Sequence, residues 1–149
     1  MVNATSLVKA VLVRSPLARY VFPTYPYNFT PAQLCFLCQC LEDTRGVPGT
    51  VLEVGCWKGG TTIFLAKYLR AQRIDRSYFA IDTFAGFTAA DIDYEAKTRG
   101  KDRRLFNYFS ANSQAWFDAT MRRNGVPEVR SVTADVNQYD LRTLGPVAF

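Results

Sequence analysis

One short segment concentrates residue types that could bind a charged ligand. It runs from Glu53 to Thr62 with the sequence EVGCWKGGTT, directly after an apolar run that predicts a buried strand. Gly55 would allow a tight turn, and Gly59 would allow a ligand to approach the backbone closely. The free amides around Gly60, at the start of the next predicted helix, would suit a carboxylate.

A second acidic residue is placed to complete the same site. Asp82 ends the next predicted strand, which covers Ser77–Ile81. Ligands of parallel α/β sheets bind beyond the carboxyl ends of the strands, so Asp82 and the Glu53 segment should lie at one edge. A carboxylate there can accept hydrogen bonds from both hydroxyls of a ribose. The site would then offer one group for a ribose and another for an anionic tail.

Two cofactor classes compete for this pattern. A dinucleotide-binding loop has the form G-x-G-x-x-G. This chain has E-x-G-x-x-x-G instead, with the bulky Trp57 where the middle glycine would stand. An NAD-binding oxidoreductase fragment is therefore the less favoured alternative, and a glycine turn that binds no ligand is another.

The pattern resembles motif I of class I S-adenosylmethionine-dependent methyltransferases. Together with the run IDTFAGF over residues 81–87, it is similar to the macrocin O-methyltransferase-like family, over about residues 30–149. The resemblance implies O-methylation of a small-molecule hydroxyl, often on a sugar of a glycosylated natural product. It implies that Glu53 organises the methionine amino end, that Asp82 holds the ribose and that Asp135 lies near the adenine. For Asp135, a simple loop cap is an equal alternative. The implied cofactor-binding residues are Glu53, Gly55, Gly59, Gly60, Thr61, Asp82, Thr83 and Asp135.

The resemblance also implies a divalent metal, such as Mg²⁺, in full-length relatives. Its ligands, the general base and the acceptor pocket would lie beyond Phe149, so the catalytic residues are unknown and we expect no metal ligand within this chain. We therefore expect the N-terminal part of a methyltransferase, truncated at its C-terminus. A truncated, non-catalytic methyltransferase-like protein is the alternative.

The elements that must position these residues alternate between strand and helix. Helices are expected at residues 31–44, 61–73 and 109–123, and strands at residues 50–54, 77–81 and 129–133. A polar loop is expected at residues 88–106, and the start of a fourth strand at residues 146–149. This order predicts an α/β, Rossmann-like class I methyltransferase fold with an incomplete parallel sheet. Residues 1–29 would form an N-terminal arm with a leading helix, and residues 30–149 the cofactor-binding part.

The cysteines and the missing histidine restrict the chemistry. The chain has no histidine, which excludes a Ser-His or Cys-His pair and any histidine-ligated metal within these 149 residues. Cys35, Cys38 and Cys40 fall on the first predicted helix, and Cys56 falls in the glycine turn. We expect buried, reduced thiols at these positions, rather than a zinc site or disulfides.

Composition bears on partners and location. The net charge is +5, but the densest basic run, Lys97–Arg104, is typical of a solvated loop, and we expect no nucleic-acid partner. The acids Asp91, Asp93 and Glu95 in the same loop are expected to face solvent. No segment is long and apolar enough for a membrane span, and no export signal is evident. We expect a cytoplasmic protein that binds no membrane. Because one sheet edge and its apolar faces are open, we expect the chain alone to aggregate, to form a homo-oligomer through that surface, or to be only marginally stable.

Overall fold

The computed structural model describes Val11, Ser15 and residues 28–149. The leading helix and most of the arm predicted for residues 1–29 therefore lie outside the described residues. No helix in the described ranges is long and apolar enough to cross a membrane.

A three-stranded parallel sheet forms the centre of the fold. Its strands are β1 (Val51–Val54), β2 (Tyr78–Asp82) and β3 (Arg130–Thr133), in the order β1-β2-β3. In register, Val54 pairs with Ile81, and Asp82 pairs with Thr133. All pairs are parallel, which confirms the predicted α/β sheet.

The segment at residues 146–149 lies along the other edge of β1. Val147 forms a parallel bridge with Thr50, the Ala148 N–H donates to the Thr50 carbonyl at 2.9 Å, and the Leu52 N–H donates to the Phe149 carbonyl at 2.8 Å. The predicted fourth strand is therefore present as this short pairing. Because the chain passes first to one side of β1 and then to the other, β1 is the point where the strand order reverses.

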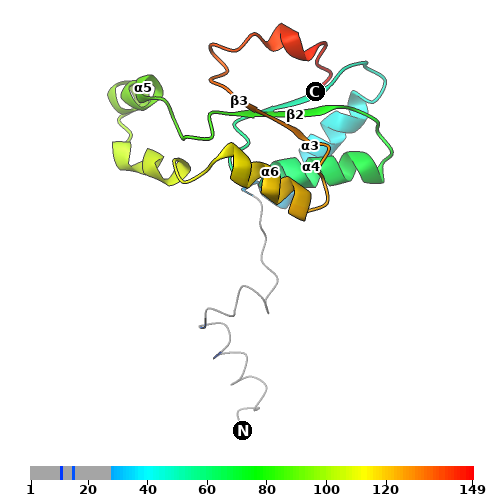
Figure 1. Ribbon diagram of the computed structural model, residues 1–149, viewed down its shortest axis with the longest axis horizontal. Helices are drawn as coiled ribbons and strands as arrows, with labels where there is room; N and C mark the ends of the chain where they lie inside the picture. The colour runs from blue at the N-terminus through cyan, green and yellow to red at the C-terminus, as the bar shows by residue number, and fades with distance from the viewer. Residues whose placement is uncertain (1–10, 12–14, 16–27) are drawn as a thin grey trace.

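Three helices cover one face of the sheet: α3 (Pro31–Asp43), α4 (Gly60–Ala71) and α6 (Gln114–Arg123). Figure 1 shows α4 and α6 on the lower side of the sheet, with the stretch that contains the 3₁₀ helix η2 (Leu141–Leu144) on the upper side. The core lies between these helices and the sheet, and its fully buried members include Leu41, Val51, Phe117, Met121 and Val126.

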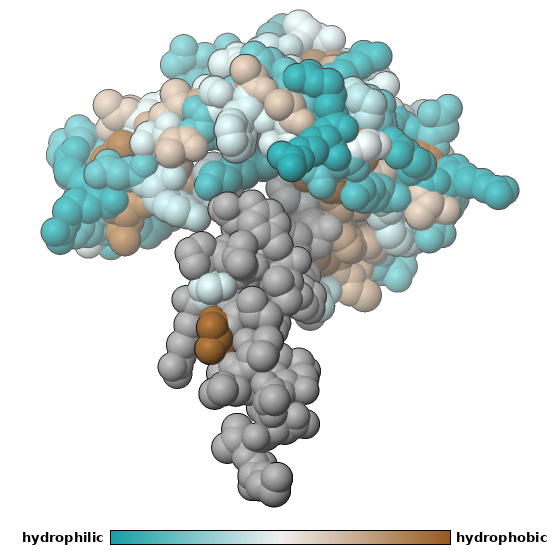
Figure 2. Space-filling model, turned by 60° about the horizontal axis from the view of Figure 1, so that its bottom comes forward, coloured by the Kyte–Doolittle hydropathy of each residue, from teal (hydrophilic) through white to brown (hydrophobic). Residues whose placement is uncertain are grey.

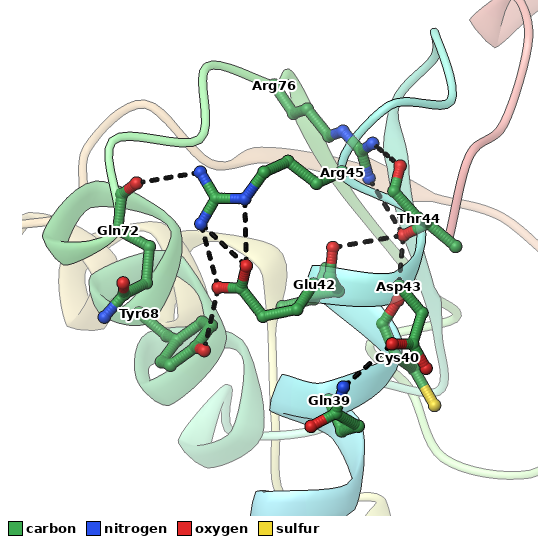
Figure 3. A network of polar contacts seen from close by, with 10 residues as sticks. Gln39, Cys40, Glu42, Asp43, Thr44, Arg45, Tyr68, Gln72 and Arg76 are labelled. Atoms are coloured by element: carbon green, nitrogen blue, oxygen red, sulfur yellow. Dashed lines mark hydrogen bonds and ion pairs between the residues drawn. The ribbon is translucent and has the colours of Figure 1, made fainter.

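The first helix begins and ends for local reasons. Thr30, a residue type typical of N-caps, forms a capping box with Gln33, and Pro31 occupies the first turn. At the other end, the Arg76 guanidinium donates to the carbonyl of Thr44, the C-cap residue (Figure 3). This bond satisfies a carbonyl that the end of α3 leaves without a helical partner. Arg76 also donates to the Val47 carbonyl in the following turn.

A polar network also joins α3 to α4. Glu42 accepts hydrogen bonds from Arg45 and from the Tyr68 hydroxyl at 2.9 Å, and Arg45 also donates to the Gln72 carbonyl (Figure 3). These bonds hold the pKa of the Glu42 carboxyl below its usual range, first through Arg45 and then through Tyr68. The two helix ends are thus held together beside the strand that carries Asp82.

The polar loop predicted at residues 88–106 is wrong. This stretch forms helix α5 (Ala89–Arg99) and the first part of the 3₁₀ helix η1 (Arg103–Phe109). No residue of α5 is buried, so no apolar period marks the helix in the sequence. Helix α5 is stabilised by a Thr88–Asp91 capping box, by Gly100 at its C-terminus and by ion pairs. The apolar pattern of the sequence reveals none of these interactions.

Two further predictions need correction. Helix α6 begins at Gln114 rather than Phe109, because the Ser113 side chain caps it by accepting from the Trp116 N–H. Cys35 is exposed, and Cys38 and Cys40 are half-buried, because α3 turns only Leu34 and Leu41 fully inward. Cys56 is buried, as expected.

Candidate functional site

Two adjoining hollows meet at the carboxyl end of β1, and the second of them continues along the length of this strand. The first, the Asp82 hollow, measures about 320 Å³, and Asp82, Thr83, Asp135, Trp57 and Phe87 are among its lining residues. The second, the Glu53 hollow, also measures about 320 Å³, and its lining includes Glu53, Cys56, Gly60, Thr61 and Phe149. They share Asn28, Val54 and Gly55. Seven of the eight predicted cofactor residues line one or both hollows, and Gly59 is the exception.

The two predicted turn glycines have different surroundings. Both have a φ of +79°, which favours glycine. A Cβ atom on Gly55 would meet no atom within 4 Å, so the space beside this turn is open to the hollows. A Cβ atom on Gly59 would lie 2.8 Å from Phe117 Cε2 and closer still to Met121 Cε. Gly59 therefore makes room for α6 side chains, whereas the sequence had suggested room for a ligand.

The N-terminus of α4 faces the Glu53 hollow. Its N-cap is Gly59, which has no side chain to accept from the first-turn amides. Gly60 and Thr61, the first two helical residues, line the hollow. Amides at a helix N-terminus carry partial positive charge, so this position suits an anionic group.

Glu53 sits beside these amides with one oxygen already engaged. Its Oε2 accepts from the Thr62 hydroxyl at 2.5 Å and from the Tyr78 hydroxyl at 2.9 Å. Burial raises the pKa of Glu53; the bonds from Thr62 and Tyr78 oppose the rise, and Asp82 adds to it. Burial also raises the pKa of Tyr78, so its hydroxyl stays protonated as a donor. A half-buried carboxylate of this kind would be stabilised by a cationic group such as an ammonium.

Asp82 connects the turns after β1 and β2. Its Oδ2 accepts from the Trp57 N–H and its Oδ1 from the Phe84 N–H, both at 2.8 Å. Each carboxylate oxygen keeps a further lone pair for a ligand hydroxyl. The neighbouring Thr83 hydroxyl donates to the Gly86 carbonyl at 2.5 Å, which closes the turn after β2.

Asp135 both lines a hollow and caps a loop. It lines the Asp82 hollow beside Val136. Its carboxylate also accepts from the Asn137 N–H at 2.9 Å and from the Gln138 side chain at 3.2 Å. It therefore caps its own loop at the edge of the cleft.

Sequence reasoning missed a cluster of aromatic side chains in the same place. Trp57, Phe87 and Phe109 line the Asp82 hollow. The Trp57 ring lies 5.1 Å from that of Tyr108 and 5.8 Å from that of Phe109, measured between centroids. Trp57 had been considered only as an obstacle to a dinucleotide. Phe87 stood at the end of the IDTFAGF run, but nothing in the sequence placed it against residues 106–109.

The remaining candidate groups are engaged or inert. Burial raises the pKa of the Cys56 thiol, so this residue is not a thiolate at neutral pH. Asp93 pairs with Lys97 and Arg103, and Glu95 pairs with Arg99 and Lys101. These acids lie on helix α5 and form ion pairs, where a loop was expected. The Asp93 side chain remains 47% exposed, as expected, whereas that of Glu95 is only 16% exposed. Within the described ranges, no group of three or more Cys, Asp or Glu side chains could hold a metal ion.

Comparison with known proteins identifies a family whose sequence pattern matches this chain. The Macrocin-O-methyltransferase (TylF) family matches residues 29–131. Mycinamicin III 3''-O-methyltransferase of Micromonospora griseorubida is 44% identical over 92 residues, covering 59% of this chain and 35% of that protein. Demethyldecarbamoylnovobiocin O-methyltransferase of Streptomyces niveus is 43% identical over 89 residues, covering 58% of this chain and 32% of that protein. The chain thus spans about a third of the length of these curated relatives.

A solved structure has the same arrangement. The O-methyltransferase NovP superposes with a TM-score of 0.51 at 29% sequence identity, covering 66% of this chain and 43% of that one.

Proposed function

Since the chain belongs to the macrocin O-methyltransferase family, we propose that its cleft binds S-adenosylmethionine as the donor of a methyl group to a hydroxyl. The observation that carries this proposal is the meeting of two different hollows at Gly55. One has a carboxylate and a helix N-terminus, and the other has a carboxylate beyond β2. A zwitterionic amino acid and a ribose need these two environments side by side.

The chain's own residues would divide the work of binding. Glu53 would hold the ammonium of the methionine end, and the amides of Gly60 and Thr61 would hold its carboxylate. Asp82 would accept from the ribose hydroxyls through its free lone pairs, with Thr83 supporting the turn. Asp135 and its loop would border the adenine. When bound, the cofactor supplies an electrophilic methyl group for in-line transfer to an oxygen.

The acceptor belongs to the proposal as well. The relatives are named for methylating mycinamicin III and demethyldecarbamoylnovobiocin, and a third for a rhamnosyl-tetracenomycin. We propose that the acceptor is a small molecule with a free hydroxyl, most simply on a sugar. We place the divalent metal and the general base outside residues 28–149, with residues 1–29 as an arm before the cofactor-binding part. We further propose a cytoplasmic homo-oligomer.

Calorimetric titration of the chain with S-adenosylmethionine, S-adenosylhomocysteine and NAD tests the donor site. We expect binding of the first two and not of NAD. Asp82→Asn should abolish binding, and the matched control Asp75→Asn, at an exposed position before β2, should retain it. Binding of NAD alone would overturn the proposal in favour of an oxidoreductase. Failure of all three ligands to bind would favour a non-catalytic relative.

A further inference from the structure

Trp57 joins the expected donor site to the opposite wall of the cleft. Its backbone N–H donates to Asp82 Oδ2 at 2.8 Å, and its carbonyl accepts from the Asn112 side chain at 2.6 Å. Its ring packs on Tyr108 and Phe109. One residue therefore contacts the ribose-binding candidate through its backbone and the segment before α6 through its carbonyl and its ring.

The opposite wall is built from aromatic rings in mutual contact. We define this aromatic wall as Phe87, Phe106, Tyr108 and Phe109. The Phe87 ring lies 5.0 Å from that of Phe106 and 5.2 Å from that of Phe109, and the Tyr108 ring lies 5.6 Å from that of Phe109. Edge-on contacts of this kind favour one arrangement of the rings. The four side chains therefore form one unit.

The four side chains differ in exposure: Phe106 is buried, Phe109 is half-buried, and Phe87 and Tyr108 are exposed. Helix α5 has no buried residue, and together with η1 it extends to the left end of the molecule in Figure 1. Figure 2 shows apolar patches among the polar residues at that end. Tyr108 is 62% exposed and Phe87 is 44% exposed. Both rings therefore offer surface to a ligand. The contact with Trp57 joins this wall to the turn after β1.

Trp57 and Asn112 do not use all of their hydrogen-bonding groups. Among the described residues, Trp57 Nε1 and Asn112 Oδ1 are buried without a hydrogen-bond partner. Buried polar atoms without partners destabilise the arrangement that contains them. A modest change in the position or freedom of the Trp57 backbone can therefore shift the balance between a packed and a loosened wall.

We propose that Trp57 is a positioning residue that couples occupancy of the Asp82 hollow to the order of the aromatic wall. The inference rests on the proposed function. Ribose hydroxyls bound to Asp82 would reduce the motion of its carboxylate, which accepts from the Trp57 N–H. Trp57 would then move less, and so would the wall residues that contact it through Asn112 and the aromatic rings. A wall ordered by the first ligand costs the second ligand less entropy. Donor and acceptor therefore favour each other's binding, and an acceptor with an apolar or sugar face packs on the ordered rings.

The chain carries a convenient reporter for this coupling. Trp116 is 66% exposed on α6, so Trp116→Phe leaves Trp57 as the single tryptophan. In that background we expect S-adenosylhomocysteine to change the emission of Trp57. In hydrogen–deuterium exchange, we expect it to slow exchange at residues 103–112 by about fivefold or more, the low end of typical coupling between sites.

Two matched variants separate the coupling from binding itself. Asn112→Asp keeps the shape but removes the donor to the Trp57 carbonyl, and it should abolish the protection with little change in the affinity for S-adenosylhomocysteine. Asn107→Ala, on the exposed face of η1, should leave the protection intact.

The outcomes distinguish this proposal from the one on which it rests. If S-adenosylhomocysteine binds but leaves the Trp57 emission and the exchange of residues 103–112 unchanged, the coupling is wrong and the donor site stands. This comparison uses the wall with its native residues, so it does not depend on the folding of Asn112→Asp. Full protection retained in Asn112→Asp would overturn the route through Trp57. If the ligand does not bind, the donor site fails and the coupling fails with it.

Discussion

Glu53 combines an unfavourable environment with the best position for a ligand cation. Burial raises its pKa, so in the ligand-free chain its charged form is less stable than in water. A group with a raised folded pKa favours folding at low pH, and that contribution disappears as the pH rises through the folded pKa. The ionised Glu53 carboxylate therefore lowers the stability of the ligand-free chain at neutral pH, and the same carboxylate is the group that would bind a ligand cation.

Glu53→Gln should raise the stability of the ligand-free chain at neutral pH and lower its affinity for the ligand. The neutral amide can still accept from Thr62 and Tyr78, so we expect the unfolding midpoint at pH 7 to rise by roughly 3 °C, the shift that about 1 kcal/mol produces in a domain of this size. We expect the affinity for S-adenosylhomocysteine to fall at least about tenfold, because a charge-assisted bond of about 1.5–3 kcal/mol is lost. Thermal melts from pH 4 to 8 and calorimetry measure both. A midpoint that falls more steeply with rising pH in the variant would contradict the assignment.

The two turn glycines should separate folding from binding. Gly59→Ala places a methyl group against Phe117 and Met121 in a left-handed conformation, so we expect about 3 kcal/mol or more of lost stability. Gly55→Ala meets no protein atom and should cost only about 1 kcal/mol of backbone strain. Its methyl group would enter the shared part of the hollows and weaken S-adenosylhomocysteine binding. Urea unfolding and calorimetry check the pair, and equal losses of stability would refute the distinction.

At the scale of elements, α5 is a helix held by its ends and its charges. Glu95 is only 16% exposed at its side chain and pairs with Arg99 at 2.9 Å and Lys101 at 2.7 Å. Asp93 pairs with Arg103 at 2.5 Å and so connects α5 to η1. Because no apolar face anchors it, this helix should open more readily than α4 or α6.

Thr88→Ala removes the capping box of α5. The expected loss is about 1 kcal/mol of local stability, because the Asp91 N–H loses its acceptor at 3.2 Å. Hydrogen–deuterium exchange should become faster at residues 89–99 and stay unchanged in α4. Thr98→Ala, exposed on the same helix, serves as the control. Uniform acceleration across both helices would show that α5 does not open independently.

Arg76 plays the corresponding role between α3 and β2. Arg76→Met keeps most of the side-chain volume but leaves the Thr44 and Val47 carbonyls without this donor, so we expect about 1–3 kcal/mol of lost stability. Arg73→Met, at an exposed position, should change stability by less than about 0.5 kcal/mol. Chemical denaturation compares the two, and indistinguishable midpoints would mean that the network in Figure 3 contributes little.

At the scale of the whole molecule, the site exists because the strand order reverses at β1. Chain segments on both sides of β1 leave a crevice at its carboxyl end, and Gly55 lies there. The segment at residues 146–149 supplies one side, and Phe149 lines the Glu53 hollow. The donor site therefore depends on a pairing between residues almost a hundred positions apart.

Ala148→Pro tests that dependence. Proline removes the N–H that donates to the Thr50 carbonyl, so the segment should detach from β1 and open the Glu53 hollow. We expect weaker S-adenosylhomocysteine binding with β1, β2 and β3 intact by circular dichroism. Ala148→Ser keeps the N–H and should bind normally. Unchanged affinity in the proline variant would show that this segment is dispensable for the donor site.

Local chemistry in the sequence determined much of this protein. Apolar β-branched runs predicted the strands, Thr30 and Pro31 predicted the start of α3, and strand ends followed by Glu53 and Asp82 predicted the location of the site. These features depend on neighbours in sequence, so single-chain patterns record them. The sequence also supplied Gly55 as the turn that the hollows share.

Only the tertiary structure decided the rest, because the deciding partners are distant in sequence. Gly59 is explained by Met121 and Phe117, and Trp57 by Asp82, Asn112 and Tyr108, none of which a local pattern can pair with it. Helix α5 lacks an apolar period because nothing packs over it, so its helicity depended on caps and ion pairs. The exposure of Cys35 followed from which face of α3 meets α4. The apolar pattern of the sequence predicts which residues are buried, but only the tertiary packing decides which side chains face the cleft.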